Sequence, residues 1–555
     1  METPDPFNPN LLTTNAVPFD DDIHRVRQIC AEHSQDLNRL NAQIERLQES
    51  LDTITSKRDA LQSRLSTLQS ITSPLRALPP EVLQTIFIKC LEPFPIISAH
   101  ESPVLLTQIC SKWRSIAIDT PALWASFHIA IVGAKHPFES YDSTCKAIRD
   151  GLQTFLSRSH SLPLNISVCS GFSPGPYNED IIREVNRTLE VLLPYHGRWK
   201  YLKLQVPQQC MASIEHLSGE GLPNLETAVM YCCAEGTFPQ PVTLSQKPFF
   251  ENAPRLRRLS IGARDHAIVY KLLGTAVSWV RLTHLIISFS YWELSPRPLE
   301  DIADVLNACA NLEECCITFP GTELETFSPR NPVIILPKLK TVALDCYFPS
   351  HMMICLLDLL VLPELKELII GGNHLPNLSS DAPVISSVVK LIQRSSCLLT
   401  HFGFKDDRGV GVVSESSPAV EHMISLLKSM PELKALNFSH TWPMTEALLK
   451  AFSNVSLDSG EILCPKLARI EFSDSASVTE QTLVHFLSMR LSPPATSVIE
   501  PLGGVVIEDA RPASDSLFAQ FGDSVQFNTL WYAGSHTGQN FRRPTSRAPE
   551  RVLWF

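Results

Sequence analysis

The first long run of residues, 22–72, places apolar side chains at alternating steps of three and four positions. With Ile23 at heptad position a and Val26 at position d, these steps continue for about seven heptads without glycine or proline. The seam comprises Ile23, Val26, Leu37, Leu40, Ile44, Leu47, Leu51, Ile54, Leu61, Leu65 and Leu68, with Cys30, His33 and Arg58 at the remaining seam positions. The pattern predicts one coiled-coil helix, preceded by a disordered N-terminus at 1–21.

Two interpretations of this helix stay open. A narrow a/d seam favours pairing with a second copy, so a homodimer through the coiled coil, parallel or antiparallel, is one of them. In the other, a single helix packs its stripe elsewhere or against a different partner. Arg58 would be costly in a dry interface because its charge must be paired or reach water.

A second apolar pattern lies at residues 74–128. It reads LRALPPEVLQTIFIKCLEPF and then, after a polar gap, VLLTQICSKWRSIAIDTPALWASF. Pro79 stands at a helix start, where its missing N–H costs little, and Glu81 falls in the first turn, where it complements the helix dipole. Such a short helical unit cannot bury this much apolar surface internally, so part of it should dock on another protein. The alternative is a plain helical hairpin that caps the following domain.

A third pattern recurs from about residue 198, with the form L-x-x-L-x-apolar, as in LPELKELII and CPKLARIEF. Each unit is predicted to supply a short strand and a return segment, often helical, such as 298–310 or 419–430. Stacked units of this kind bury one continuous core. The first apolar positions, 26 to 34 residues apart, are Trp199, Leu225, Leu256, Leu282, Leu312, Leu339, Leu365, Leu399, Leu433 and Leu467, with a degenerate unit at Leu502.

Residues that alternate with the core positions on these strands should point to the opposite face of the sheet. Their mixture of aromatic groups and both signs of charge suits protein recognition, although each one could equally be an ordinary solvated position. The predicted substrate contacts are Tyr201, Arg258, His284, His401, Asn437 and Arg469. The wider set adds Lys203, Tyr231, Tyr291, Glu314, Asp345, Glu367, Lys405 and Glu471.

The pattern divides the chain further. Residues 129–197 are predicted to be a connecting α/β segment, with a strand at 162–168 and an amphipathic helix at 180–193. The repeat array then covers 198–510, and a loose C-terminal tail covers 511–555.

Composition narrows the function. The chain has 555 residues, with 47 basic against 58 acidic side chains and a net charge of −11. This weak acidity, without a basic cluster, argues against nucleic acid as a partner. The start lacks the basic and apolar regions of a signal peptide, and the longest apolar stretch, 352–362, is too short to span a bilayer. We therefore expect an intracellular protein, cytoplasmic and/or nuclear, that contacts no membrane.

Catalytic motifs are missing from the sequence. There is no nucleophile elbow, no dinucleotide or phosphate loop, and no histidine pairing of the metalloenzyme type. We predict no catalytic residues, no metal and no cofactor, and therefore a protein that is not an enzyme.

The order and spacing of Leu78, Pro79 and Glu81, the two helical runs and the Pro121-Ala122-Leu123-Trp124 ending resemble the F-box. This module ties a protein to the Skp adaptor of a cullin ubiquitin ligase. The resemblance implies adaptor contacts through Leu78, Pro79, Ile86 and Leu105. It implies a core formed by Phe87, Trp113 and Trp124.

The array resembles an irregular leucine-rich repeat, and the layout is similar to that of many F-box proteins of mushroom-forming fungi. The implied fold is α+β and multidomain: a long N-terminal coiled-coil helix, a small all-α F-box, and an α/β leucine-rich-repeat solenoid. The implied function is the substrate-recognition subunit of a Skp–cullin–F-box E3 ubiquitin ligase, with an unknown protein substrate. The alternative is a non-ligase interaction scaffold built from the coiled coil and the repeats.

Overall fold

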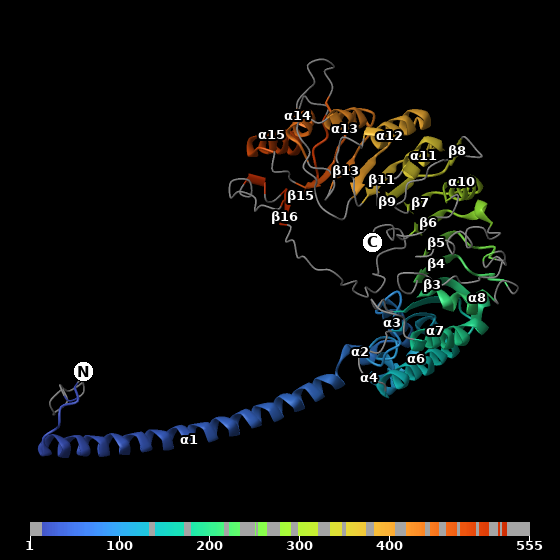
Figure 1. Cartoon of the computed structure of the whole chain (residues 1–555). Coiled ribbons are helices and arrows are strands. Elements are labelled where there is room, and N and C mark those ends of the chain that lie inside the picture. Colours follow the sequence, from blue (N-terminus) through green and yellow to red (C-terminus); the bar gives the residue numbers. More distant parts are fainter. Residues whose placement is uncertain are drawn as a thin grey trace. The chain divides into compact units, whose positions relative to one another are not determined.

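The computed structural model divides the chain into two compact units, Met1–Leu83 and Gln84–Phe555 (Figure 1). We describe each by itself. The residues that the structure describes are 11, 14–131, 139–170, 179–215, 221–233, 250, 253–263, 278–289, 298–319, 333–346, 351–372, 382–405, 418–438, 444–453, 462–473, 478–494, 499–509, 520–521 and 524–529.

The first unit is dominated by one helix, α1, which spans Asp20–Ile71 and contains 52 residues. Its first turn carries Asp20, Asp21 and Asp22, whose charges complement the positive end of the helix dipole. Thr72 is the C-cap residue of the helix and precedes a short turn of helix, α2 (Pro74–Ala77). The long N-terminal helix predicted from the heptad pattern is therefore confirmed. Of its predicted disordered N-terminus, residues 1–10, 12 and 13 lie outside the described residues.

Short helices follow. The backbone N–H of Leu83 donates to the carbonyl of Pro79 at 3.2 Å, so the chain enters α3 (Pro80–Lys89) at the proline, as predicted. In the second unit come α4 (Leu106–Ile109), α5 (Ser111–Ile118) and the 3₁₀ turn η2 (Pro121–Trp124).

The second unit is built on one sheet of fourteen strands in which each neighbouring pair is parallel. The strands follow the chain in spatial order. They are β1 (Ser126–Ile131), β2 (Leu164–Ser170), β3 (Trp199–Pro207), β4 (Thr227–Cys233), β5 (Arg258–Ala263), β6 (His284–Phe289), β7 (Glu314–Phe319), β9 (Thr341–Cys346), β11 (Glu367–Gly372), β12 (His401–Lys405), β13 (Ala435–Phe438), β14 (Arg469–Ser473), β15 (Gly504–Asp509) and β16 (Val525–Thr529). A separate pair joins β8 (Ile334–Ile335) to β10 (Leu360–Val361).

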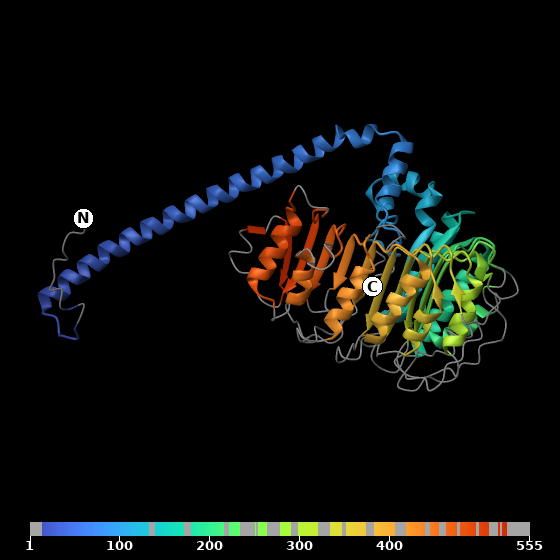
Figure 2. The same cartoon turned by 90° about the horizontal axis from the view of Figure 1, so that it is seen from above.

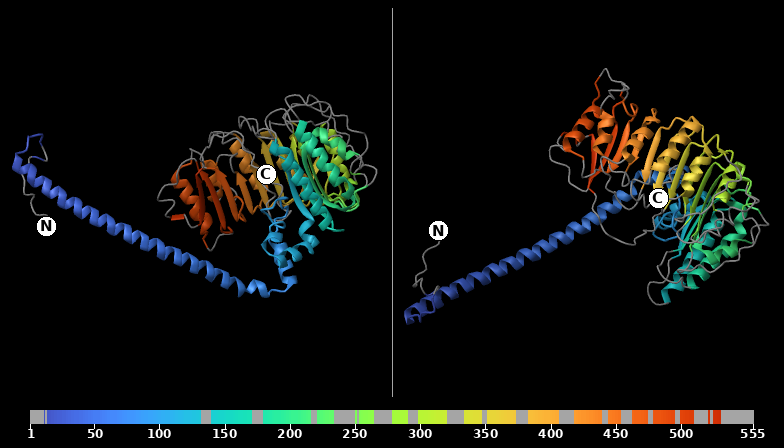
Figure 3. Two further views of the ribbon diagram at one scale, coloured as in Figure 1. Left: turned by 90° about the horizontal axis from the view of Figure 1, so that it is seen from below. Right: turned by 45° about the horizontal axis from the view of Figure 1, so that its top comes forward.

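Helices lie along one face of this sheet (Figures 1 and 2). They are α6 (Glu139–Arg158), α7 (Glu179–Leu192), α8 (Ala212–Glu215), α10 (Pro298–Ala308), α11 (His351–Leu359), α12 (Ala382–Ser395), α13 (Pro418–Lys428), α14 (Glu446–Ser453) and α15 (Glu480–Leu491). The 3₁₀ turns η3 (Leu193–Arg198), η4 (Gln208–Met211) and η6 (Trp279–Arg281) complete the connections. We call the other face of the strands the open face; none of the helices α6 to α15 lies over it (Figure 3).

The predicted repeat units stack in register. Arg258 of β5 pairs with His284 of β6, which pairs with Glu314 of β7, and each residue is two positions after the first apolar position of its unit. The side chain next along each strand points to the helices and forms a buried row. This row contains Leu202, Ala228, Leu259, Leu285, Cys315, Val342, Leu368, Phe402, Leu436, Ile470 and Val505, all at most 2% exposed.

A ladder of polar side chains links the turns before the strands. Arg255 donates to Asn224 Oδ1 at 3.0 Å, and Lys466 donates to both carboxylate oxygens of Glu432 at 2.6 and 2.7 Å. Each of these residues stands immediately before the first apolar position of its unit. The pairs are partly exposed, so each contributes little free energy, about 0–1 kcal/mol, and mainly fixes the spacing of neighbouring units.

Arginine side chains satisfy carbonyl groups at the helix ends. Arg198 Nε donates to Leu162 O at 2.9 Å, and Arg394 Nη2 donates to Leu357 O at 2.7 Å and Leu360 O at 2.8 Å. Each arginine reaches back to the preceding unit, so it ties neighbouring units together as it satisfies carbonyls in the last turn of a helix or in the residues just after it.

The sheet begins earlier than predicted. The segment 129–197 is not a mere connection, because it supplies the second half of β1, all of β2 and the helices α6 and α7. The strand and helix expected within it are present as β2 and α7, shifted by one or two residues. The helical module predicted at 74–128 is not wholly helical either, since Ser126, Phe127 and His128 belong to β1.

The sheet also ends later than predicted. The degenerate unit at Leu502 is in register, because Val505 pairs with Ile470. One more strand, β16, pairs with β15 and lies inside the stretch expected to be a tail at 511–555. Residues 530–555 of that stretch lie outside the described residues.

Candidate functional site

Helix α3 separates its apolar residues into two faces. Leu83 and Phe87, four positions apart, are each only 1% exposed, whereas Val82 and Ile86 are 42% and 37% exposed. Residues four apart share a face of a helix, so α3 has one buried and one accessible apolar face. Ile86 thus has the accessibility that an adaptor contact needs.

The other predicted adaptor contacts are also at least partly accessible. Leu105 is 38% exposed, and Ile109, at the end of α4, is 55% exposed, while Leu106 between them is buried. In the first unit, Leu78 is half-buried and Pro79 is exposed. Apart from the buried Leu106, each of these side chains is therefore at least partly accessible to solvent.

The three predicted core residues differ in burial. The rings of Phe87 and Trp113 lie with their centroids 4.9 Å apart, and Trp113 is half-buried. Trp124 is fully buried, and its Nε1 donates to Ala117 O at 2.8 Å.

Trp124 also contacts residues outside the predicted helical module. Its ring meets Phe155 of α6 edge to face, with centroids 5.0 Å apart, and the guanidinium of Arg158 lies 4.4 Å from the ring centroid. The side chain therefore joins η2 to the first helix of the sheet. Such an aromatic pair and cation–π contact each add about 0.5–1.5 kcal/mol beyond the area buried.

A segment between the short helices covers the edge of the sheet. Ile96 forms a parallel bridge with His128 of β1, and the backbone N–H of His128 donates to Pro95 O at 2.8 Å. The ring of Phe94 lies against Tyr201 of β3, with centroids 4.8 Å apart. An uncovered edge strand invites pairing with other chains, so this cover protects β1 and holds the short helices to the sheet.

The side chains of the open face fall into lateral rows, and five of the six predicted substrate contacts share one row. We define the open-face row as the residues two positions after each first apolar position. It contains Tyr201, Thr227, Arg258, His284, Glu314, Thr341, Glu367, His401, Ala435, Arg469 and Gly504. Asn437 lies two residues further along its strand and donates to Glu471 Oε2 at 3.2 Å.

Tyr201 fits the prediction of a substrate contact least. Its ring is half-buried against Phe94, and burial raises its pKa to about 12. The phenol therefore stays neutral. No sequence pattern indicated this contact, because Phe94 lies outside the repeats. Of the wider set, Tyr291 lies outside the described residues.

Two histidines of the open-face row share one arrangement that the sequence analysis missed. His284 Nδ1 lies 2.8 Å from Thr283 Oγ1, and His401 Nδ1 lies 2.9 Å from Thr400 Oγ1. Both threonines also donate to a backbone carbonyl of the preceding unit. The recurring Thr-His pair in VRLTHLII and CLLTHFGF is the feature of the sequence that could have indicated this arrangement.

Glycines make room for large side chains on the open face. A Cβ on Gly262 would lie 2.5 Å from Cδ1 of Tyr231, and one on Gly371 would lie 2.7 Å from Oδ1 of Asp345. Glycine within a strand often marks such a close approach. Tyr231 can thus lie over β5 while its hydroxyl is 3.0 Å from Ser260 Oγ.

His284 is expected to stay neutral at pH 7. Partial burial and the Arg258 guanidinium lower its pKa below 6.5, and they outweigh Glu313, which raises it. A protonated ring would also pair with Glu314, whose Oε1 is 3.4 Å from Nε2. Because the folded pKa is below that of the unfolded chain, the stability that the neutral ring contributes is present above pH 6.5 and lost as pH falls.

NMR titration of the His284 imidazole measures its pKa and so tests this prediction. Arg258→Ala should raise the pKa of His284, since it removes the neighbouring positive charge. Arg469→Ala removes an equal charge from a distant strand and should leave the pKa unchanged. A wild-type pKa at or above 6.5 would contradict the assignment.

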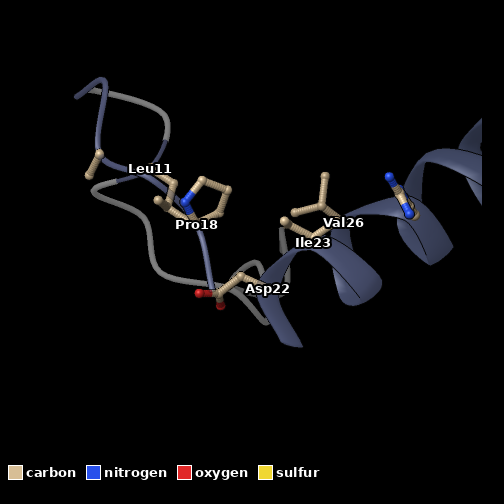
Figure 4. Close-up of a pocket in the computed structure, with 7 residues that line it drawn as sticks. Leu11, Pro18, Asp22, Ile23 and Val26 are labelled. Atoms are coloured by element: carbon tan, nitrogen blue, oxygen red, sulfur yellow. The ribbon is translucent and has the colours of Figure 1, made fainter. Parts of the chain in front are cut away.

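The described residues contain no group of three or more His, Cys, Asp or Glu side chains placed to hold a metal ion. Among the described helices, none combines the length and apolar character needed to cross a membrane. A hollow at the start of α1 is lined by Leu11, Ala16, Pro18, Asp22, Ile23, Val26 and Arg27 (Figure 4). It is mostly apolar and brings together no set of groups typical of catalysis.

No protein-family model and no curated protein matches the chain.

Proposed function

We propose that this chain is the substrate-recognition subunit of a Skp–cullin–F-box ubiquitin ligase. The observation that carries the proposal is the division of α3 into a buried face with Phe87 and an accessible apolar face with Ile86. An adaptor-binding helix needs both properties, because one face must hold the module together while the other is buried only on binding.

The adaptor surface would be formed by Leu78, Pro79, Ile86 and Leu105, which is the assignment that the F-box resemblance implies. Their exposure supports it, and Ile109 extends the accessible apolar surface. The cullin would be reached only through the adaptor, and the chain would perform no chemistry itself.

The target would bind on the open face of the sheet, which an irregular leucine-rich repeat would present. The open-face row supports a protein target, since it runs from a cation at Arg258 past the neutral His284 to an anion at Glu314 and has a second cation at Arg469. The row lies on strands whose opposite side chains are buried, so binding should require little further ordering of the strands, which would lower the entropy cost of recognition. Catalysis would lie in other subunits, and this chain would raise the effective concentration of the target.

The attachment of the short helices to the sheet suits this role. Trp124 and Phe94 both connect the box-like segment to the first strands or helices of the array. A receptor benefits from such a joint because it orients the bound target relative to the adaptor. We place the chain inside the cell, in the cytoplasm and/or nucleus, where such ligases act.

Co-purification tests the proposal against a non-ligase scaffold. The tagged full-length chain, recovered from cells and resolved by mass spectrometry, should bring down a Skp-type adaptor together with a cullin. An adaptor without cullin would favour the scaffold. Neither protein at the level of a tag-only control would overturn the proposal.

A further inference from the structure

The seam of α1 is an unpartnered apolar stripe along the helix. Nine of its side chains, from Leu37 to Leu68, are between 52% and 68% exposed. A stripe of this length, seen with heptad spacing, is an association surface. The polar residues within the seam determine which partner helix can pack against it.

The two most polar seam residues indicate the partner. His33 occupies a d position and Arg58 an a position, and they are equally far from a point between residues 45 and 46. In an antiparallel pair of coiled-coil helices, position a of one helix faces position d of the other. We propose that α1 forms an antiparallel homodimer whose two-fold axis passes between residues 45 and 46.

This register gives every seam residue a seam partner. The layers are Ile23 with the partner's Leu68, Val26 with the partner's Leu65, Cys30 with the partner's Leu61, His33 with the partner's Arg58, Leu37 with the partner's Ile54, Leu40 with the partner's Leu51, and Ile44 with the partner's Leu47. The two polar positions meet each other, so neither faces an apolar side chain. Polar seam residues commonly select orientation and register in this way.

Charges beside the seam support the same register. Asp36 and Lys57 occupy g positions, and antiparallel pairing brings Asp36 close to the partner's Lys57 on both sides of the axis. Neither side chain forms an ion pair within the described residues, so both are available. The flanking g and e positions place no two like charges together.

A parallel dimer of α1 would have less favourable seam contacts. It would stack Arg58 on the partner's Arg58 and His33 on the partner's His33, and Asp36 would face the partner's Asn41. In the single chain, Arg58 instead pairs with its neighbour Asp59 at 2.6 Å, with both side chains exposed. An exposed pair of this kind contributes little, so it does not hinder rearrangement on dimerisation.

The antiparallel arrangement has a consequence for the assembly. The overlap from Ile23 to Leu68 is roughly 70 Å long at 1.5 Å per residue. The C-terminal ends of the two helices would lie at opposite ends of it. The dimer would therefore hold two copies of the following segment apart, whereas a parallel dimer would bring them together.

Sedimentation equilibrium of the full-length chain tests the orientation, because one substitution should strengthen an antiparallel dimer but weaken a parallel one. His33→Glu should lower the dimer Kd about tenfold, because each introduced carboxylate would meet the partner's Arg58. In a parallel dimer the same change would stack two carboxylates and weaken binding. Ile44→Asp, at the centre of the seam, should give a monomer and so assign association to α1.

A charge exchange provides the second readout. Asp36→Lys or Lys57→Asp alone should raise the Kd about tenfold, and the double exchange should restore it. Glu49→Lys, an equal charge change at an outward f position, is the matched control and should have no effect. The proposal is overturned if the wild type is monomeric at 100 μM, forms another oligomer, or is weakened by His33→Glu; a monomer would leave the stripe to a different protein.

Discussion

Replacing Leu78-Pro79 with Ala-Ala and Ile86 with Asp is expected to abolish binding of a Skp-type adaptor. The change removes apolar contact area and introduces a carboxylate that the interface would have to bury without a partner. Burying an unpaired charge is strongly unfavourable, so the Kd should rise about 100-fold or more. Titration calorimetry of purified chain and adaptor measures it.

The folded state of this variant should survive. Ile86 is 37% exposed, so Asp at that position reaches water in the unbound chain. The matched control is Leu398→Asp, which puts the same charge on an apolar side chain that is 63% exposed on the repeat array. The control should bind normally, and a triple variant within about threefold of the wild type would show that the adaptor assignment is wrong.

Replacing Arg490 with Met is expected to destabilise the C-terminal repeats. Arg490, in α15, is fully buried, and it donates to the carbonyls of Phe452 at 3.0 Å and Cys464 at 3.1 Å and to that of Leu463. Methionine fills similar volume but leaves these carbonyls without the donors. The loss should be about 3–5 kcal/mol, since unsatisfied buried acceptors cost more than a hydrogen bond normally contributes.

Because repeats interact mainly with their neighbours, the loss should be local. Hydrogen exchange should increase in α14, β14 and α15, whereas β3 to β6 should keep their protection. Arg469→Met removes an exposed arginine from the neighbouring strand and serves as the control. Equal exchange in the two variants would contradict the stabilising role of the hydrogen bonds that Arg490 donates.

Arg490 also shows how much a buried cation depends on its acceptors. Burial lowers its pKa to about 10, yet the side chain stays protonated at neutral pH. The several carbonyl acceptors explain why a charge is tolerated in this position.

Regular patterns of the sequence were enough to predict much of the fold. The heptad predicted α1 because neither glycine nor proline interrupts it, and the first apolar positions of the repeats predicted strands that pair in register. The same alternation placed Arg258, His284, His401 and Arg469 in one row. The spacing of apolar residues along the sequence is enough for these predictions, because the side chains of every strand alternate between the same two faces of the sheet.

Long-range contacts could not be predicted in the same way. The strands β1 and β16 have no L-x-x-L signature and are identified by their pairing. Arg490 stands in the last turn of α15, where an arginine would ordinarily be exposed. The partners of Trp124 and Tyr201 lie 31 residues after and 107 residues before them, at Phe155 and Phe94.

We propose that one surface connects the chain to a ligase and another holds the target. A quantitative pull-down from proteasome-inhibited cells, comparing wild type with the Leu78-Pro79/Ile86 variant, tests both parts of this proposal. We predict that the variant loses adaptor and cullin together and keeps the other captured proteins at wild-type levels. If adaptor and cullin are recovered equally with both chains, or with neither, the proposed receptor function is wrong.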